Sequence, residues 1–272
     1  MAFETVREGL TLFYTDDGKG EIPLLFVHGW ACDSHDWSWQ IPHFAEKARV
    51  IAVDLRGHGA STATEDGYEP EVFAEDLVLL LDRLKVDRVV AIGHSLGGSV
   101  VAALAVNHPG RVAGVVPIDP MYGWPRDQAI GFIQLAEAAR DDNGREVASQ
   151  VLDRASVTGP EFLRTWHSRR ALASNARACA ETLWSVWIHP RQFATRPESD
   201  VYLARRQCPA LSIFNSERRD TVEWAQSLAR SPLDRALTLP TGHWAHQEEP
   251  RVVNHLIETW IADLPEAPQI LS

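Results

Sequence analysis

Short β-branched runs alternate with amphipathic stretches along the first 120 residues of the chain. Within residues 72–84, apolar side chains recur at spacings of three and four from Phe73 to Leu84, which predicts a helix that packs on a sheet. Alternation of strands with helices is typical of a mostly parallel sheet with crossover helices. We predict strands near Thr5 and at residues 10–14, 24–27, 50–53, 88–92 and 114–118.

The strand pattern disappears between residue 121 and about residue 206. Helical spacing replaces it in residues 130–136, 147–152, 162–172 and 178–187. Strands return at 210–214 and 236–239, followed by a helical pattern over 252–264. We therefore predict a sheet-forming part, residues 1–120 and 207–272, and an inserted helical part, residues 121–206. The inserted part is expected to cover the carboxyl ends of the strands as a lid.

The length of 272 residues fits one large α/β domain with an insertion, which can bury a full core without disulfides. The cysteines Cys32, Cys179 and Cys208 are odd in number and widely spaced, so we expect a reduced, cytoplasmic protein. A net charge of −11 argues against nucleic acid as a partner, because phosphate contacts need a basic face. The N-terminus lacks the features of a signal peptide, and no apolar stretch is long enough to span a membrane.

Residues 93–97 read Gly-His-Ser-Leu-Gly directly after the strand predicted at 88–92. A Gly-x-Ser-x-Gly box between a strand and a helix is the pattern of a nucleophile elbow, where strained backbone presents a serine and glycines avoid clashes. Residues 100–106, rich in alanine and valine, supply the helix. The box alone also occurs in ordinary turns, but in this setting it predicts Ser95 as a nucleophile.

A serine hydroxyl needs a general base, and the usual base is a histidine late in the chain. His243 follows the strand predicted at 236–239, and Gly242 lets the loop turn tightly beside it. His246 is the main competitor, and we expect it instead to cap or pack against the following helix. We therefore predict His243 as the base. His167 and His189 are expected to face solvent or to cap helices.

Four segments together resemble the α/β-hydrolase fold superfamily, especially its serine esterases and lactonases. They are His28-Gly29-Trp30, residues 54–61, the box around Ser95, and the Gly-His pair that precedes Trp244. The resemblance implies an eight-stranded, mostly parallel sheet with a helical lid inserted after strand 6. It also implies an oxyanion hole formed by the backbone N–H groups of Trp30 and Leu96, which would stabilise a developing alkoxide. No cofactor is implied, and no metal-ligand spacing is found among the histidines and cysteines.

The acid of the predicted triad does not stand where most of that superfamily place it. Their Gly-x-x-Asp turn follows the strand predicted at 210–214, where this chain has Asn215 and Arg218. Some dehalogenases and the cofactor-free heterocycle dioxygenases carry the acid at a second position, the end of the preceding strand. In this chain Asp119 occupies that position. It follows the predicted nucleophile by 24 positions, which suits one strand-helix-strand passage. We predict Asp119 as the acid, with Asp220 and Glu217 as alternatives.

Tryptophans gather in the segments expected around the site. Of the ten, four lie in the predicted lid and four more lie in segments that border the site. Aromatic walls suit a flat or apolar acyl or ring substrate, although each of these residues could instead pack in a small core of the lid. The predicted pocket residues are His94, Cys32, Trp124, Trp166, Trp184, Trp187 and Trp244.

The leading hypothesis is hydrolysis of an ester, lactone or related acyl bond of an apolar or aromatic small molecule by Ser95, His243 and Asp119. Serine at the elbow argues against dehalogenases and epoxide hydrolases, which need a carboxylate nucleophile. The alternative is a cofactor-independent ring-cleaving dioxygenase of a 3-hydroxy-4-quinolone, using a His-Asp dyad. Those enzymes share the His-Ser and Gly-Trp pairs but tend to carry a histidine where this chain has Cys32. Nothing in the sequence favours a third possibility, a ligand sensor on the same fold, and the natural substrate and oligomeric state do not follow from the sequence.

Overall fold

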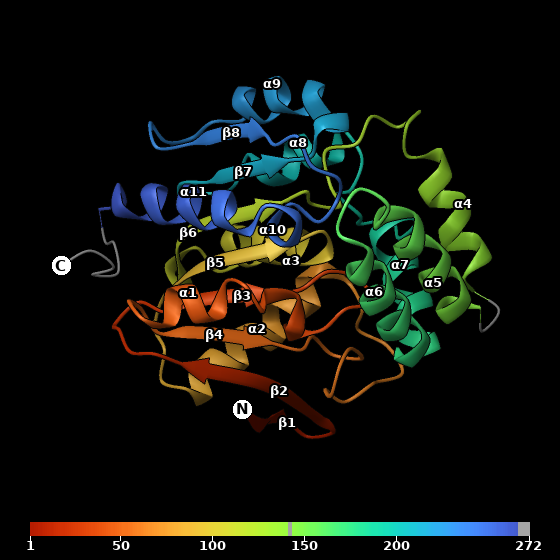
Figure 1. Cartoon of the computed structure of the whole chain (residues 1–272), viewed down its shortest axis with the longest axis horizontal. Helices are drawn as coiled ribbons and strands as arrows, with labels where there is room; N and C mark the ends of the chain where they lie inside the picture. Colours follow the sequence, from red (N-terminus) through yellow and green to blue (C-terminus); the bar gives the residue numbers. More distant parts are fainter. Residues whose placement is uncertain (141–142, 266–272) are drawn as a thin grey trace.

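An eight-stranded sheet forms the centre of the computed structural model, which describes residues 1–140 and 143–265 (Figure 1). The strands lie in the order β1-β2-β4-β3-β5-β6-β7-β8. β2 pairs with β1 and β4 antiparallel, and the other neighbouring pairs are parallel. The predicted mostly parallel, eight-stranded sheet is thus confirmed. The strands are β1 (Ala2–Arg7), β2 (Leu10–Asp17), β3 (Leu24–Val27), β4 (Val50–Val53), β5 (Val89–His94), β6 (Val112–Ile118), β7 (Leu211–Phe214) and β8 (Arg235–Thr238).

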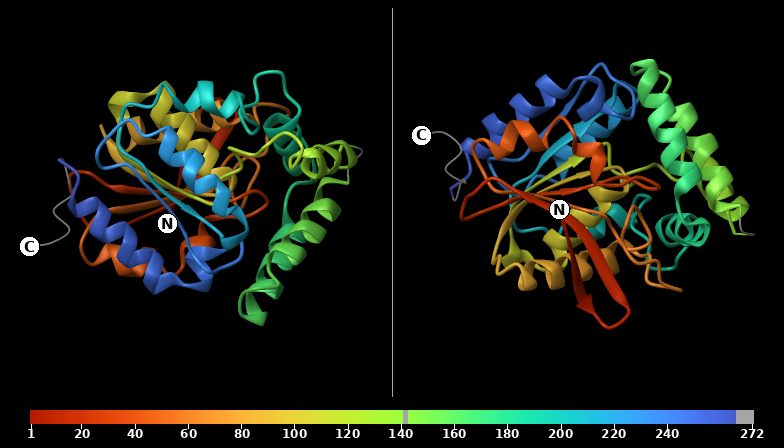
Figure 2. Two further views of the ribbon diagram at one scale, coloured as in Figure 1. Left: turned by 90° about the horizontal axis from the view of Figure 1, so that it is seen from above. Right: turned by 60° about the horizontal axis from the view of Figure 1, so that its bottom comes forward.

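Helices cover both faces of this sheet (Figures 1 and 2). Side chains of α2 and α3 pack on one face, and side chains of α1 and α11 pack on the other. The helices of the sheet-forming part are α1 (Ile41–Ala45), α2 (Pro70–Arg83), α3 (Leu96–Asn107), α9 (Arg219–Ser227), α10 (Ala245–Glu248) and α11 (Pro250–Ala262), with short 3₁₀ turns η1 (Ser34–Trp37), η2 (Pro109–Arg111) and η3 (Ser216–Arg218). α9 was not predicted, and of its nine residues only Thr221 is buried.

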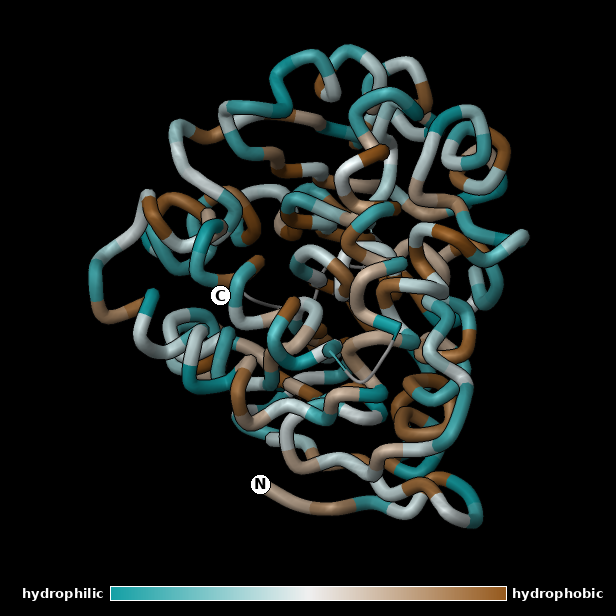
Figure 3. Tube along the Cα trace, turned by 90° about the vertical axis from the view of Figure 1, so that its right-hand side faces the viewer, coloured by the Kyte–Doolittle hydropathy of each residue, from teal (hydrophilic) through white to brown (hydrophobic). Residues whose placement is uncertain are grey.

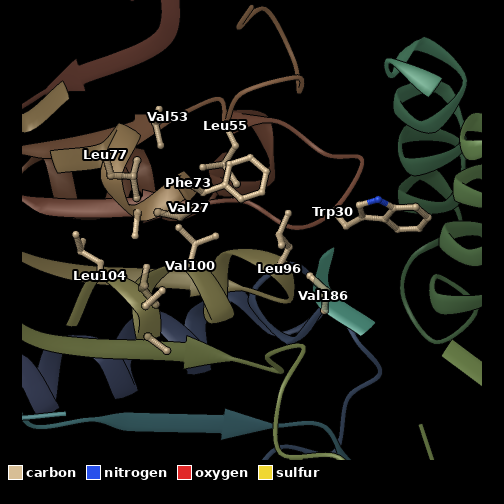
Figure 4. Close-up of a cluster of buried hydrophobic side chains, with 14 of the residues drawn as sticks. Val27, Trp30, Val53, Leu55, Phe73, Leu77, Leu96, Val100, Leu104 and Val186 are labelled. Carbon is tan, nitrogen blue, oxygen red and sulfur yellow. The ribbon is translucent and has the colours of Figure 1, made fainter. Parts of the chain in front are cut away.

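The period-two alternation of strand side chains divides the interior into two apolar cores. On one face, Val27 and Val53 meet Phe73 of α2 and Val100 of α3 (Figure 4). On the other face, Phe26 packs among residues of α1 and α11. Because both faces of the central strands are covered, these strands read in the sequence as continuous apolar runs.

Among the described residues between β6 and β7 there are five helices. α4 to α7 gather beyond the carboxyl ends of the parallel strands (Figures 1 and 2). Polar and apolar residues are mixed along the chain on this side of the molecule (Figure 3). The five are α4 (Ile130–Ala138), α5 (Gly144–Ala155), α6 (Glu161–Ala173), α7 (Ala176–Trp187) and α8 (Glu198–Leu203), of which the short α8 was not predicted. Within residues 1–140 and 143–265, no helix combines the length and apolarity needed to cross a bilayer.

Candidate active site

Ser95 lies on the sharp turn between β5 and α3. Its backbone angles are φ 53° and ψ −113°, a strained conformation for a residue that carries a side chain. A Cβ atom on Gly93 would lie 2.1 Å from the Gly97 carbonyl oxygen, and one on Gly97 would lie 2.1 Å from the Val27 carbonyl oxygen. The turn therefore needs glycine at both ends of the box, which is the physical basis of the sequence pattern.

Two backbone N–H groups beside Ser95 are free to act as donors. Leu96 is the first residue of α3, so its N–H has no partner within the helix. In the described part of the chain, neither this group nor the N–H of Trp30 donates a backbone hydrogen bond. A Cβ on Gly29 would lie 3.4 Å from the Ser95 Cβ, so the loop that carries Trp30 runs directly against the serine. This geometry allows the two amides to bind a developing oxyanion.

Asp119 and His243 form a hydrogen-bonded pair at the carboxyl edge of the sheet. The His243 Nδ1 lies 2.5 Å from the Asp119 Oδ2, and the Asn215 Nδ2 donates to the same oxygen at 2.8 Å. The second carboxylate oxygen lies 3.6 Å from Arg218. Burial by itself raises the pKa of Asp119, but the hydrogen bond and charge of His243, together with Arg218 and Asn215, lower it below the usual range.

The two alternative acids lie elsewhere. Glu217 is exposed on the wall of the cavity described below, and Asp220 is exposed on α9. Neither makes a hydrogen bond or ion pair with His243 among the described contacts, in which the imidazole pairs with Asp119. The structure thus brings together the residues predicted as base and acid, although they lie 124 positions apart in the chain.

The remaining histidines of this region are buried behind the His243 loop. The His94 Nε2 lies 2.8 Å from the His243 carbonyl oxygen, so the two share a hydrogen bond that supports the loop. The His246 ring packs 4.6 Å from the Trp37 ring and 4.5 Å from that of His94. Burial lowers the pKa of both His94 and His246 well below the usual value. His246 therefore packs in the interior.

A cavity of about 270 Å³ opens beside Ser95 and His243. Its floor is polar and includes Asp119 and Asn215, whereas most of its walls come from the inserted helices and the segment before them. The Phe132 and Trp187 rings stack at 4.6 Å, which makes one wall a rigid aromatic surface. Its principal apolar residues are Trp124, Phe132, Leu135, Val151, Leu183 and Trp187. Such a mostly apolar site with a few convergent polar groups is typical of small-molecule pockets.

Of the predicted pocket residues, the three tryptophans Trp124, Trp187 and Trp244 line this cavity. The other four do not. Cys32 and His94 are buried beneath the site, Trp166 is 40% exposed against Phe162, and Trp184 packs on His189. Because a residue's face on a helix depends on how that helix docks, aromatic content alone could not separate the two groups. Four other apolar side chains line the cavity: Phe132, Leu135, Val151 and Leu183. In the sequence they belong only to the general helical pattern, which gives no sign of a ligand.

His167 is buried, contrary to the expectation that it faces solvent. Its ring stacks on the Trp244 ring at 3.7 Å, because α6 packs against the loop that carries His243. Its Nδ1 lies 2.6 Å from the Ser156 hydroxyl, and its Nε2 lies 3.0 Å from the Gln247 Oε1. His167 therefore ties the inserted helices to this loop.

Acidification is expected to destabilise the fold through such histidines. Burial lowers the pKa of His167 to about 4, below the value of about 6.5 expected in the unfolded chain. Between these values the unfolded state binds more protons, so stability is full above about pH 6.5 and falls as the pH drops toward 4. We expect the slope of Tm against pH, measured by circular dichroism, to be shallower in His167→Gln. The control His35→Gln, at an exposed position, keeps the wild-type slope, and equal slopes in wild type and His167→Gln would contradict this expectation.

One group of described residues has the spacing of metal ligands. Single ligand atoms of Asp36, His94 and His246 lie within 4.8 Å of one another, and all three residues are buried. However, Asp36 already pairs with Arg170. A divalent ion would therefore bury additional positive charge beside a guanidinium, which is costly. We assign no metal to this cluster.

A family model described as alpha/beta hydrolase fold matches residues 22–204, more than half of the chain. A bifunctional esterase/perhydrolase of Acinetobacter calcoaceticus is 38% identical over 111 residues, 40% of this chain and 40% of that protein. A non-heme haloperoxidase of Rhodococcus erythropolis is 40% identical over 120 residues, 43% of each chain. The match thus spans about two fifths of these curated relatives.

A solved structure resembles nearly the whole chain. It belongs to an N-acyl homoserine lactone degrading enzyme that is 27% identical, and the match covers 93% of this chain and 98% of that one with a TM-score of 0.73. The similarity therefore extends through the inserted helices as well as the sheet.

Proposed function

Since the chain belongs to the α/β-hydrolase fold family, we propose that it hydrolyses an ester, lactone or related acyl bond of an apolar or aromatic small molecule. The observation that carries this proposal is the Asp119–His243 pair, which shares the wall of an apolar cavity with Ser95. The names of two relatives, an esterase/perhydrolase and an N-acyl homoserine lactone degrading enzyme, support acyl chemistry.

In the proposed reaction, the Ser95 hydroxyl attacks the substrate carbonyl while His243 takes its proton. The amides of Trp30 and Leu96 hold the oxyanion, and Asp119 stabilises the imidazolium. The leaving alkoxide then takes the proton from His243, which releases an alcohol and leaves an acyl-serine. Water then attacks the acyl-serine while His243 takes its proton, and His243 donates that proton to the Ser95 oxygen as the acid leaves.

The proposed mechanism needs a hydrogen bond between the Ser95 hydroxyl and the His243 imidazole. The hydrogen bonds of residues 1–140 and 143–265 include none between the Ser95 hydroxyl and His243. Catalytic hydrogen bonds are often long before a substrate binds and tighten in the complex. The proposed mechanism therefore includes a small approach of the imidazole to the serine on substrate binding.

A panel of p-nitrophenyl esters, from acetate to octanoate, and of aliphatic lactones tests the proposal. The wild-type protein is expected to release p-nitrophenol with saturation kinetics, which absorbance measures directly. Lactone opening is followed by the acid it releases. A folded protein that hydrolyses no member of either series would overturn the proposed function.

A second candidate function is cofactor-independent cleavage of a 3-hydroxy-4-quinolone ring. The position of Asp119 at the end of β6, paired with His243, favours it. The dyad would deprotonate the substrate hydroxyl, and the resulting anion would react with molecular oxygen, with loss of carbon monoxide. Against this candidate, Cys32 stands buried where such enzymes tend to carry a histidine. Oxygen uptake and carbon monoxide release with an alkyl hydroxyquinolone would identify it.

Trp187 is expected to limit the length of the acyl chain. Trp187→Leu shortens the side chain on the cavity wall, so we expect the ratio of kcat/KM for octanoate over acetate to rise about tenfold, which is the lower end of the effect of one methylene in an apolar pocket. The matched control is Trp184→Leu on the same helix, because Trp184 lies outside the cavity. An unchanged ratio in Trp187→Leu, or an equal rise in both variants, would show that this wall does not select the substrate.

A further inference from the structure

We propose that Arg218 is a positioning residue, which holds the Asp119–His243 pair in the deprotonated form that can accept a proton from Ser95. The inference rests on the proposed function and assigns a role to a residue outside the predicted triad. Arg218 occupies the turn after β7. In most α/β-hydrolases, which this chain resembles, the acid of the triad stands in this turn.

The guanidinium of Arg218 is fixed from several sides. It is buried, and its two terminal nitrogens donate to the carbonyl oxygens of Pro120 and Tyr122, each at 2.7 Å. Those carbonyls belong to the loop that follows Asp119. The side chain therefore cannot swing away from the carboxylate without breaking two buried hydrogen bonds.

The same guanidinium supplies the charge that balances Asp119. It lies 3.6 Å from the Asp119 Oδ1, an oxygen with no hydrogen-bond partner among the described residues. The carboxylate is 3% exposed, so its ionised form is costly unless a cation lies nearby. In the described structure, Arg218 is the permanently charged side chain within ion-pair distance of Asp119.

Other groups around the imidazole do not replace this charge. Burial lowers the pKa of His94, His167 and His246, so these rings are neutral near pH 7. Arg154 and Glu217 are exposed on the cavity wall, and Glu248 accepts a hydrogen bond from the Gly242 N–H. Behind the loop, the buried Asp36 is paired with Arg170, so these two charges balance each other. With Arg218 present, the ionised Asp119 and the guanidinium form an electrically balanced pair beside the imidazole. Without Arg218, the Asp119–His243 pair would retain a proton to higher pH.

Arg218 also links the pair to the cavity wall. Its guanidinium lies 4.2 Å from the centre of the Trp124 ring, a cation–π contact, and Trp124 lines the cavity. A change of Arg218 can therefore alter substrate binding as well as protonation. For this reason the test separates KM from the pH dependence of kcat.

The test measures kcat and KM for an ester across the pH range in Arg218→Met and Arg218→Lys. In Arg218→Met, the acid limb of kcat should move up by about one to two pH units, as expected when a nearby opposite charge is lost. At a pH on the wild-type limb, kcat would then fall about 10- to 100-fold and recover at higher pH. Arg218→Lys keeps the charge but not the planar fork, so its limb should move less.

The control is Arg56→Met, which breaks an equally buried pair, Arg56–Asp76, away from the cavity. This variant should lower Tm and leave the acid limb in place. A wild-type acid limb in Arg218→Met would overturn the inference, as would an equal shift in Arg56→Met.

A second readout does not depend on turnover. The proton between the His243 Nδ1 and the Asp119 Oδ2 should give a far-downfield resonance in the proton NMR spectrum. The pH at which this resonance changes is expected to rise in Arg218→Met and to stay unchanged in Arg56→Met. If the wild-type protein hydrolyses no ester, the proposed function fails, yet this titration still decides whether Arg218 controls the pair. Should Arg218→Met not fold, Arg218→Gln removes the same charge and retains hydrogen-bond donors.

Discussion

Replacement of Ser95 by alanine is expected to reduce kcat for ester hydrolysis by about 10⁴- to 10⁶-fold, because no other group can form the acyl intermediate. The fold should survive. Alanine keeps the Cβ that already occupies this positive-φ position, and Ser95 is only 6% exposed in a well-packed turn. The residual rate would come from binding and from the amides of Trp30 and Leu96. Stopped-flow and steady-state release of p-nitrophenol measure the loss.

Ser99→Ala is the matched control. Ser99 lies one turn farther along α3, is buried, and has a hydroxyl without a partner among the described residues. Its removal should leave kcat and Tm close to wild type. Retention of a tenth or more of the wild-type kcat in Ser95→Ala would exclude Ser95 as the nucleophile. If oxygen uptake with a hydroxyquinolone also survived, the dioxygenase alternative would gain support.

Asp119→Asn is expected to lower kcat by about 10³- to 10⁴-fold. An amide cannot stabilise the imidazolium as a carboxylate does, and it favours the wrong tautomer of His243. Since the pKa of Asp119 is lowered below its usual range, the carboxylate is ionised at neutral pH and contributes stability above the unfolded value of about 3.9, which is lost on further acidification. The amide variant leaves Arg218 buried without a counterion, so Tm should also fall.

Asp220→Asn and Glu217→Gln serve as controls for this variant. Both residues are exposed, and neither pairs with His243 in the described structure. Their kcat values should stay within a few-fold of wild type. A silent Asp119→Asn, or an equally large loss in either control, would place the acid elsewhere.

Features set by local backbone chemistry could be predicted from the sequence. The eight strands follow from apolar runs, and the turn at Ser95 follows from glycines that no larger residue can replace. Each of these depends on neighbours only a few positions away. The mostly parallel sheet class and the family resemblance then follow from the succession of such elements along the chain.

Features that depend on how distant elements dock could be decided only in three dimensions. The sequence left Asp119, Glu217 and Asp220 as candidates for the acid. The contact of Asp119 with the His243 imidazole appears only in the fold, because the two residues lie 124 positions apart. The burial of His167, and the placement of Trp187 but not Trp184 on the cavity wall, depend on how α6 and α7 pack.

Arg218 is the clearest example of a residue whose surroundings could not be predicted from the sequence. In the sequence it marks a missing acid, whereas in the fold it carries the charge that balances Asp119. A local sequence pattern indicates backbone constraints and the periodicity of apolar residues, because both depend on residues only a few positions apart. The sequence by itself therefore determined where the strands lie along the chain and the serine turn, whereas their order in the sheet came from the fold. Only the tertiary structure decided which charged groups meet and which side chains face the cavity, because desolvation and Coulomb interaction act between atoms that are close in space but far apart along the chain.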